Sequence, residues 1–282
     1  MKAKSMKVRT FSPGWILAFA FAFVWLIVTG LPFYYMIVTS FKTLGEFLGD
    51  GLFELPASWI PVNYIKVFEG SFLRYLVNSV ILIAVTLTLL LLLSAFAAYP
   101  LARMKFRLNR PIFSVIVAAM SVPIYITLIP LFIMAINTNT YDTRWALIGP
   151  NLAFNLPMSV FILTSFMQSI PRELEEAAEI DGCGRFSTFF RIIFPLSRPG
   201  LATLGIYNGV VIWNEFCFVM VLTQSPAVRT LPLAVWDYQG QYSINIPLIL
   251  AVLTLSSLPI ILLYLFSQDK LVKGMMVGAV KG

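Results

Sequence analysis

Six long apolar runs, separated by short polar segments, dominate the pattern of the chain. Each run is long enough to cross a bilayer as a helix, because a spanning helix needs about 20 mostly uncharged residues. The runs predict spans near 14–39, 76–100, 111–136, 146–168, 201–222 and 246–267. No segment alternates apolar and polar residues as a half-buried strand does, so the pattern predicts an all-α protein.

Composition places these helices in a membrane. The 282 residues are 59% hydrophobic and only 12% charged, with a mean hydropathy of +0.85, which is too apolar for a soluble domain of this size. The first run follows a basic start, but it is too long for a signal peptide and lacks a small-residue cleavage site, so we expect a retained anchor. The predicted single transmembrane domain, 1–282, divides into an anchor helix with an outer loop, a core bundle and a tail. Their ranges are 14–70, 71–268 and 269–282.

The basic residues are unevenly shared between alternate loops. Fifteen of the 20 Lys and Arg fall in the two termini and in the segments around Arg103 and Arg172, and the others fall in the remaining loops. Because cytoplasmic loops carry the excess of basic residues, we expect a multi-pass protein with both termini in the cytoplasm. The net charge of +7 and the pI of 9.5 do not indicate nucleic-acid binding, since the cations are dispersed.

Residues for enzymatic chemistry are scarce. The chain has no His and only two cysteines, Cys183 and Cys217, which lie in unlike segments. We therefore predict no metal site, no disulfide and no catalytic residue. A G-x-x-x-x-G-K-[ST] phosphate loop is also missing, so we do not expect this chain to bind ATP.

One segment is too charged for lipid. Residues 170–199, here named the charged hairpin, carry four glutamates and an aspartate in their first part, and each would cost about 2.5 kcal/mol or more at the bilayer centre. Pro171 and the glutamates favour a helix start, and Gly182 favours a left-handed stop.

A second helix is predicted after that glycine. Phe186, Phe189, Phe190 and Ile193 follow the spacing of one apolar stripe, which Pro195 should end. A helix, glycine turn and helix would present small and acidic residues to a partner. The competing interpretation is a solvated loop at the membrane surface, in which the glycine is only a cap.

The series Glu176-Ala177-Ala178, Gly182, Ile192 and Pro195 resembles the EAA loop of bacterial and archaeal ABC importer permeases. One departure is Phe194, where the family usually has leucine. The resemblance implies that these six residues couple the chain to an ATPase subunit.

Other stretches narrow the resemblance to carbohydrate permeases of the maltose-transporter inner-membrane, binding-protein-dependent class. They are Ala102–Arg107, Thr127–Phe132, Trp213–Phe216, Arg229–Leu233 and the tail Val272–Gly282. The resemblance implies a type I ABC importer permease fold in a bacterial or archaeal cytoplasmic membrane. It also implies import of a sugar, oligosaccharide or related polyol.

The same resemblance implies partners. They are a second, related permease in a heterodimer, two ATPase subunits that bind ATP and Mg, an extracellular solute-binding protein, and membrane lipid. In that family the tail, with Gly278 and Lys281, points toward the ATPases, although a frayed terminus is an equal interpretation. The solute itself is not determined by the sequence.

Glu215 is the one ionisable residue that we place inside a predicted span. With Asn208, Trp213 and Asn214 it could line the solute pathway, because intramembrane carboxylates usually face a cavity or a bundle interior. It could instead brace a helix contact, or carry protons as in secondary transporters. Trp213 could stack on a sugar or simply pack. Two other functions stay open: a related permease for polyamine, phosphate or peptide, and an ion-coupled transporter that uses Glu215.

Overall fold

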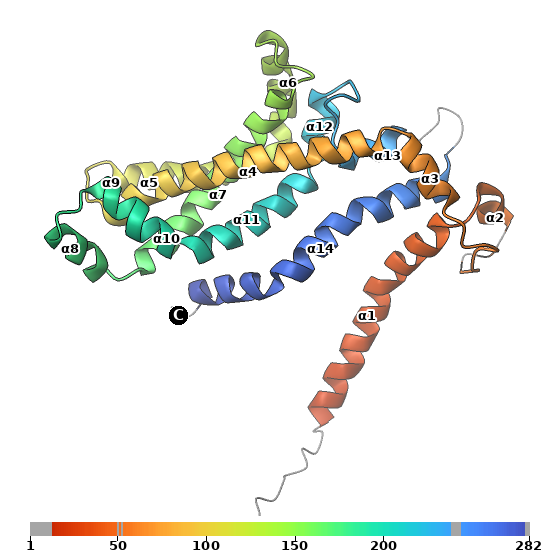
Figure 1. Ribbon diagram of the computed structural model, residues 1–282, viewed down its shortest axis with the longest axis horizontal. Helices are drawn as coiled ribbons and strands as arrows, with labels where there is room; N and C mark the ends of the chain where they lie inside the picture. The colour runs from red at the N-terminus through yellow and green to blue at the C-terminus, as the bar shows by residue number, and fades with distance from the viewer. Residues whose placement is uncertain (1–12, 50, 52, 238–243, 280–282) are drawn as a thin grey trace, which may run out of the picture. The chain divides into compact units, whose positions relative to one another are not determined.

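The computed structural model describes residues 13–49, 51, 53–237 and 244–279, and these residues form helices joined by short loops, with no β-strand among them (Figure 1). The predicted all-α class is therefore confirmed for the described residues. The chain divides into two compact units. Unit one holds residues 1–67 and 239–254, and unit two holds 68–238 and 255–282.

In unit one, the loop after the first helix folds back on the end of that helix. Its helices are α1 (Pro13–Ser40), α2 (Leu44–Gly49) and most of α3 (Val62–Glu69). The Asn63 side-chain amide donates to the backbone carbonyls of Ser40 and Lys42, both at 2.8 Å. Asn63 therefore satisfies carbonyls at the C-terminal end of α1, which have no partner within the helix.

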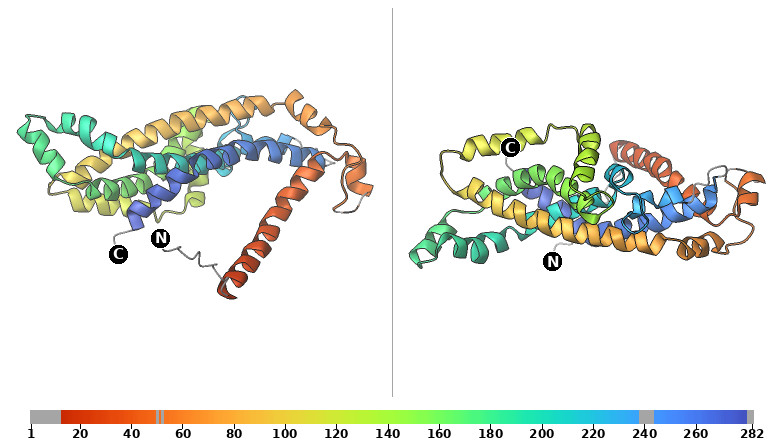
Figure 2. Two further views of the ribbon diagram at one scale, coloured as in Figure 1. Left: turned by 60° about the horizontal axis from the view of Figure 1, so that its bottom comes forward. Right: turned by 90° about the horizontal axis from the view of Figure 1, so that it is seen from above.

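Unit two is built around α4 (Phe72–Arg103), which packs along α7 (Arg144–Ser169) and against α11 (Arg198–Trp213) (Figure 2). Its other elements are α5 (Asn109–Ala119), η1 (Ile124–Thr127), α6 (Leu128–Asn137), α8 (Glu173–Ile180), α9 (Arg185–Thr188), η2 (Phe189–Ile193), α10 (Phe194–Leu196), α12 (Cys217–Leu222), η3 (Leu231–Leu233) and α13 (Ala234–Asp237). Helix α14 (Ile246–Ala279) has residues in both units.

Small residues allow these helices to approach closely. Ala95, Ala98 and Ala102 recur every three or four positions on α4 and are buried. On α11, a Cβ at Gly200 would lie 2.9 Å from Cγ of Phe166 on α7. Small residues at helix crossings are the usual means of close packing in membrane proteins, where lipid is as apolar as the side chains.

The two ends of α4 carry different cores and different cations. A helix of this length is about 48 Å long. At its start, Asn78 donates to the carbonyls of Ala227 and Arg229 and accepts from Arg144. At its end, Arg103 reaches the charged hairpin. Arg144 and Arg229, which the sequence assigns to outer loops, therefore lie near the start of α4. Arg103, which the sequence assigns to an inner loop, lies at its other end.

The end of α4 nearest the hairpin has its own core, here named the hairpin-side core. It consists of Ala95, Ala98, Tyr99, Ala102, Leu163, Met167, Ile170, Phe189, Ile193 and Leu204. Residues from α4, α7, the hairpin and α11 thus meet in one cluster. The hairpin is consequently packed on the bundle through its second half.

The six predicted spans are not six straight helices. Among the described residues, four helices are long and apolar enough to cross a membrane: α1, α4, α7 and the part of α14 up to Phe266. The predicted span 111–136 is instead a pair, 109–119 and 124–137, bent by 86°. Pro123 lies at the bend, where it lacks an N–H donor and restricts the residue before it, so the helix cannot continue.

The predicted span 201–222 is also interrupted. Helix α11 ends at Trp213 and the six-residue α12 begins at Cys217, so neither piece has the length of a span by itself. Helix α14 continues to Ala279, and the residues 269–279 of the predicted tail are therefore helical. Lys281 lies outside the described residues.

Candidate functional site: the charged hairpin and its anchorage

The first half of the charged hairpin is a short helix closed by a glycine, as the sequence predicts. Helix α8 spans Glu173–Ile180, with three glutamates in its first turn. Gly182 has φ 76°, the left-handed conformation that a side chain disfavours. The Cys183 N–H donates to Ala178 O at 2.8 Å and the Gly182 N–H to Glu179 O at 3.0 Å. These two bonds form a Schellman motif, which satisfies the last carbonyls of α8.

One face of α8 is open and the other is not. Glu176 and Ala177 are exposed, and Ile180 is 87% exposed. Ala178 is only 4% exposed. The predicted small-residue patch therefore does not present both alanines, because Ala178 lies against the rest of its own chain.

The second half of the hairpin does not stop at Pro195. Helix α9 passes through a π-helical turn, Phe189–Ile193, into α10, and the chain continues after Ser197 into α11. The N–H of Phe194 donates to Phe189 O, a bond that spans five residues instead of four. The expectation that Pro195 breaks the helix is wrong, because Pro195 stands in the first turn of α10, where its missing N–H costs little.

The predicted apolar stripe is divided by the same π turn. Phe189 and Ile193 are buried in the hairpin-side core, but Phe186 is 81% exposed and Phe190 is 52% exposed. The i, i+3, i+4, i+7 pattern assumes 3.6 residues per turn, and a π turn adds a residue to that count. Ile192, one of the predicted coupling residues, is partly buried and packs against the hairpin-side core.

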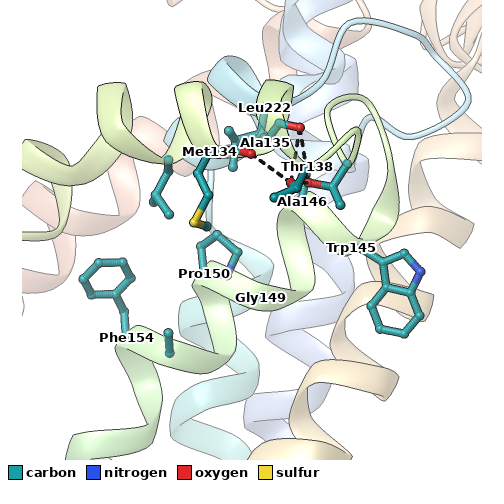
Figure 3. Close-up of a pocket in the computed structure, with 12 residues that line it drawn as sticks. Met134, Ala135, Thr138, Trp145, Ala146, Gly149, Pro150, Phe154 and Leu222 are labelled. Carbon is teal, nitrogen blue, oxygen red and sulfur yellow. Dashed lines mark hydrogen bonds between the residues drawn. The ribbon is translucent and has the colours of Figure 1, made fainter.

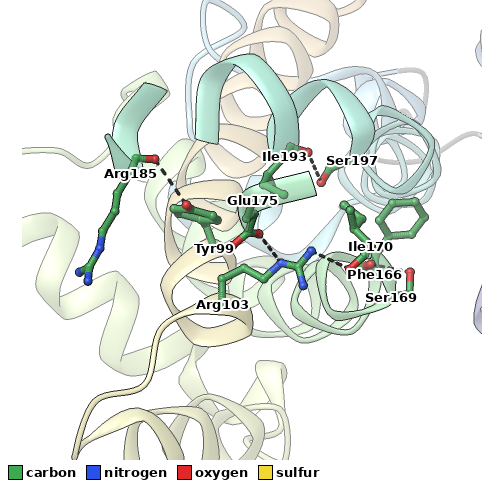
Figure 4. Close-up of polar contacts among 9 residues, drawn as sticks. All are labelled: Tyr99, Arg103, Phe166, Ser169, Ile170, Glu175, Arg185, Ile193 and Ser197. Atoms are coloured by element: carbon green, nitrogen blue, oxygen red, sulfur yellow. Dashed lines mark hydrogen bonds and ion pairs between the residues drawn. The ribbon is translucent and has the colours of Figure 1, made fainter. Parts of the chain in front are cut away.

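Arg103, the last residue of α4, holds the hairpin at its entrance (Figure 4). Its Nε lies 2.7 Å from Oε1 of Glu175, and the two side chains are 3% and 19% exposed. This contact is an ion pair without an aligned hydrogen bond. Another nitrogen of the same guanidinium donates to the carbonyl of Ile170 at 2.7 Å. One side chain therefore ties α4 both to the end of α7 and to the first turn of α8.

A second, weaker contact lies one turn earlier on α4. The Tyr99 hydroxyl donates to the carbonyl of Arg185 at 3.4 Å, at the start of α9. The hairpin is thus attached to α4 on both sides of its glycine turn. These contacts with α4 hold the hairpin in position, and the exposed face of α8 is held with it.

Burial raises the pKa of Glu175, and Glu179 adds to that rise, whereas Arg103 and Arg172 oppose it. The pairing of Arg103 with Glu175 cannot be predicted from the sequence. They are 72 positions apart, and nothing in the local pattern connects them. The sequence signal for Arg103 is its place in Ala102–Arg107, one of the stretches that carry the family resemblance.

The four residues proposed for the solute pathway do not form one polar surface in the described structure. Asn208 and Trp213 are buried, whereas Asn214 is exposed. Asn208 donates to Ser159 on α7 at 3.0 Å and to Leu204 O at 2.9 Å. Its side chain therefore braces α11 against α7.

Glu215 lies in the break between α11 and α12. Its carboxylate accepts from the N–H groups of Phe218, at 2.9 and 3.0 Å, and of Val219, at 3.3 Å. It thus caps the start of α12, where N–H groups lack helical partners. Asn214 donates to Val210 O in its own helix. These contacts account for Glu215 as a structural cap, and its role in a pathway stays a prediction.

A cavity of about 440 Å³ lies between α6 and α7 (Figure 3). Trp145, Phe154 and Leu131 line it together with small residues of α7. Its two hydroxyls are already engaged: Thr138 donates to Met134 O at 2.8 Å, and Thr138 and Thr140 bond each other at 2.9 Å. Such a lining suits an apolar occupant better than a solute rich in hydroxyls. In the described part of the chain, no group of three His, Cys, Asp or Glu side chains is placed to hold a metal.

Comparison with known proteins gives a family. The description "Binding-protein-dependent transport system inner membrane component" matches residues 90–277. The chain is 50% identical over 264 residues to a "Putative ABC transporter permease protein ORF2" of Caldicellulosiruptor sp. (strain Rt8B.4), covering 94% of this chain and 96% of the relative.

Two further relatives are named for sugar compounds. The "Sulfoquinovosyl glycerol transport system permease protein SmoH" of Agrobacterium fabrum is 36% identical, covering 99% of both chains. The "Melibiose/raffinose/stachyose import permease protein MelC" of Bacillus subtilis is 34% identical, covering 89% of this chain and 91% of the relative.

Solved structures share the fold. A chain of a bacterial ABC transporter involved in the import of the acidic polysaccharide alginate superposes with a TM-score of 0.78 at 20% identity, covering 93% of this chain and 99% of that one. A chain of an alginate transporter in complex with a pentasaccharide-bound periplasmic protein gives 0.69 at 15% identity, covering 90% and 92%. At these identities the likeness concerns the fold alone.

Proposed function

Because this chain belongs to the family of binding-protein-dependent transport system inner membrane components, we propose that it is the permease subunit of an ABC importer for a sugar, oligosaccharide or related polyol. The chain is a membrane transport subunit and not an enzyme. The sugar assignment is supported by relatives named for melibiose, raffinose and stachyose and for a sulfoquinovosyl glycerol.

One observation carries the coupling role: the charged hairpin is anchored on one side and open on the other. Arg103 fixes α8 to α4, while Glu176, Ala177 and Ile180 stay exposed. A docking segment needs both properties. The open face binds the partner, and the anchored face transmits the partner's movement to the helices of the bundle. We therefore propose that Glu176, Ala177 and Gly182 act in ATPase coupling, with Ile192 and Pro195 as structural support.

Ala178 has a different part in this proposal. Its carbonyl closes the Schellman motif and its side chain is buried. It therefore stabilises the shape of α8 and does not contact the ATPase. Gly278 falls in the last turn of α14, and Lys281 lies outside the described residues. Their direction toward the ATPases stays part of the proposal by family resemblance.

The proposed assembly contains a second, related permease, two ATPase subunits that bind ATP and Mg, and a solute-binding protein outside the membrane. The structural neighbour in complex with a periplasmic protein supports such a partner. We propose that the chain lies in a bacterial or archaeal cytoplasmic membrane, and the basic residues near Arg103 and Arg172 support a topology with both termini inside. Its family is an inner membrane family.

An ion-coupled transporter that uses Glu215 has no specific support in the structure. The Glu215 carboxylate is occupied by two backbone N–H groups. These bonds fix the carboxylate in position at the start of α12. Uptake that follows an ion gradient without the ATPase subunits would nevertheless establish such a mechanism.

The test is uptake by the reconstituted importer in vesicles, with a labelled oligosaccharide and its binding protein. Glu176→Lys and Gly182→Ile are expected to abolish ATP-driven uptake and stimulated ATP hydrolysis while membrane insertion is retained. Glu54→Lys, on an exposed residue of unit one, is the control and should leave both activities unchanged. Normal stimulated ATP turnover in both hairpin variants would overturn the coupling role.

A further inference from the structure

A basic pocket lies where α4 passes into α5, beside the entrance to the charged hairpin. It has a volume of about 690 Å³. Lys105, Arg107 and Arg110 line it from the α4–α5 segment, and Arg172 lines it from the residue before α8. Its lining contains no carboxylate. Four cations from two separate segments therefore converge on one concave site.

Hydrogen bonds of Asn109 hold the segment that supplies three of these cations. The Asn109 side-chain amide donates to Leu101 O at 3.1 Å and to Met104 O at 3.0 Å. The Asn109 N–H donates to Phe106 O at 3.1 Å. Asn109 thereby satisfies carbonyls at the end of α4 and closes the turn that carries Lys105 and Arg107. These hydrogen bonds give the segment that lines the pocket a defined conformation.

Among the described residues, no carboxylate neutralises the positive charge of the pocket. No ion pair of Lys105, Arg107 or Arg110 is present in the described part of the structure. Arg172 acts on Glu175, where it opposes the rise in pKa that burial causes, but Glu175 is already paired with Arg103. Cations held together without counter-charges repel one another, and an anion that enters between them relieves this repulsion. Guanidinium groups suit phosphate oxygens in particular, since they donate in a planar fork.

Apolar side chains around the pocket indicate that this anion belongs to a lipid. On and just before α5, Leu108 is 59% exposed and Val115 is 69% exposed, and no residue of α5 is buried. Helix α5 is also half of the bent pair that is apolar enough to cross a membrane. An apolar cavity of about 420 Å³, lined by Phe96 and Phe186, shares Met104 with the basic pocket.

We propose that this pocket binds the phosphate headgroup of an anionic phospholipid, in the leaflet on the side of the charged hairpin. The acyl chains would lie along the exposed apolar face of α5. Basic pockets between spanning helices are known lipid headgroup sites. A headgroup held by Arg107 and Arg172 together joins the α4–α5 segment to the start of α8, so the bound lipid stiffens the same junction that Arg103 secures.

The test measures lipid retained by the full chain in nanodiscs made of equal parts of phosphatidylcholine and phosphatidylglycerol, counted by native mass spectrometry. The wild type is expected to retain phosphatidylglycerol in preference to phosphatidylcholine. Lys105→Gln, Arg107→Gln and Arg110→Gln are expected to weaken retention by about fivefold for each cation removed. All three residues are exposed, so the variants should fold, which size-exclusion chromatography checks.

Two controls separate the pocket from general surface charge. Arg191→Gln with Arg198→Gln removes two exposed cations outside the pocket and should leave retention unchanged. Arg107→Lys with Arg110→Lys keeps the charge and should preserve most of the retention. Equal loss in the Arg191 and Arg198 variant would overturn the proposal, because it would show unspecific attraction to the surface.

The source of the phosphate is tested with soluble anions. Inorganic phosphate and glycerol 1-phosphate, which have the headgroup chemistry without acyl chains, should not displace phosphatidylglycerol at equal concentration. Full displacement by either would show a site for free phosphate and overturn the lipid assignment. Retention by the triple glutamine variant equal to the wild type would overturn the site itself, as would loss of bound lipid whenever the proposed ATPase subunits are present.

Discussion

Arg103 and Glu175 meet at 2.7 Å although 72 positions separate them in the chain. The guanidinium also reaches the carbonyl of Ile170, so one side chain joins the ends of α4, α7 and α8. The contact gives the charged hairpin a fixed orientation relative to two helices of the bundle. A load on the exposed face of α8 therefore acts on α4 and α7 at the same time.

Removal of Arg103 should loosen this junction. Arg103→Ala leaves the Glu175 carboxylate and the Ile170 carbonyl without their partner, and breaking such a largely buried pair costs about 3 kcal/mol. We expect a lower melting temperature in detergent and reduced ATP-driven uptake. Glu69→Gln, on an exposed residue at the end of α3, is the control and should change neither. An Arg103→Ala variant with wild-type uptake would show that the junction carries no coupling.

Gly200 should tolerate no side chain. A Cβ there would meet the Phe166 ring at 2.9 Å, so Gly200→Ala must push α11 from α7, at a cost of about 1–3 kcal/mol. Gly209→Ala on the same helix meets no atom within 4 Å and should be neutral or gain up to about 1 kcal/mol from helix propensity. Thermal unfolding of both variants checks the difference. Restoration of stability by Gly200→Ala with Phe166→Leu would locate the clash.

Gly182 should tolerate a side chain only at a cost in hairpin stability. Its φ of 76° costs a residue with a Cβ about 1–2 kcal/mol. Gly182→Ala should therefore increase hydrogen exchange of the backbone N–H groups at positions 182 and 183, which close the Schellman motif. Gly184→Ala is the control, because Gly184 has an ordinary extended backbone and open space at its Cβ position. Equal exchange in the two variants would contradict the role of the left-handed turn.

Asp142 should make stability depend on pH in the acidic range. Burial alone would raise the pKa of Asp142, but the N–H groups of Gln224 and Ser225, with a contribution from Arg229, lower it on balance. Its carboxylate accepts from those N–H groups at 2.8 and 3.0 Å. Because the pKa is lowered by folding, the stabilisation is present above the ordinary value of 3.8 and is lost as the pH falls through the folded value.

The comparison that isolates this effect is Asp142→Asn, which suits the positive φ at this position. The melting temperature of the wild type should exceed that of the variant at neutral pH. The difference should shrink as the pH falls below 3.8. A difference that stays constant with pH would show that ionisation of Asp142 does not contribute.

Two substitutions of Glu215 distinguish its role as a structural cap from a role in the solute pathway. Glu215→Ala removes both acceptors at the start of α12 and should destabilise the protein by about 1 kcal/mol. Glu215→Gln keeps an acceptor oxygen and should stay closer to the wild type. If Glu215→Gln abolishes uptake while assembly, stability and ATP hydrolysis are retained, the carboxylate belongs to the solute pathway and not only to the cap.

Local pattern was sufficient where the physical cause is local. The apolar runs predict the helices, and Gly182 predicts the turn that ends α8, because a left-handed cap depends on a few neighbouring residues. The stretches that carry the family resemblance were also visible in the sequence. The structure places three of them at helix junctions: Ala102–Arg107 at the end of α4, Thr127–Phe132 at the start of α6, and Trp213–Phe216 between α11 and α12.

Only the tertiary structure decided the geometry of these junctions and the contacts that their side chains make. The mean hydropathy of a segment does not depend on whether its helix is straight or bent. It therefore could not predict the 86° bend in the third run or the interruption at Glu215. The π turn before Pro195 changes the helical period within the predicted stripe. Only Phe189 and Ile193 of that stripe lie in the hairpin-side core, whereas Phe186 and Phe190 are exposed. The pairing of Arg103 with Glu175 depends on how α4 and α7 pack, which is a property of the folded chain and of no segment within it.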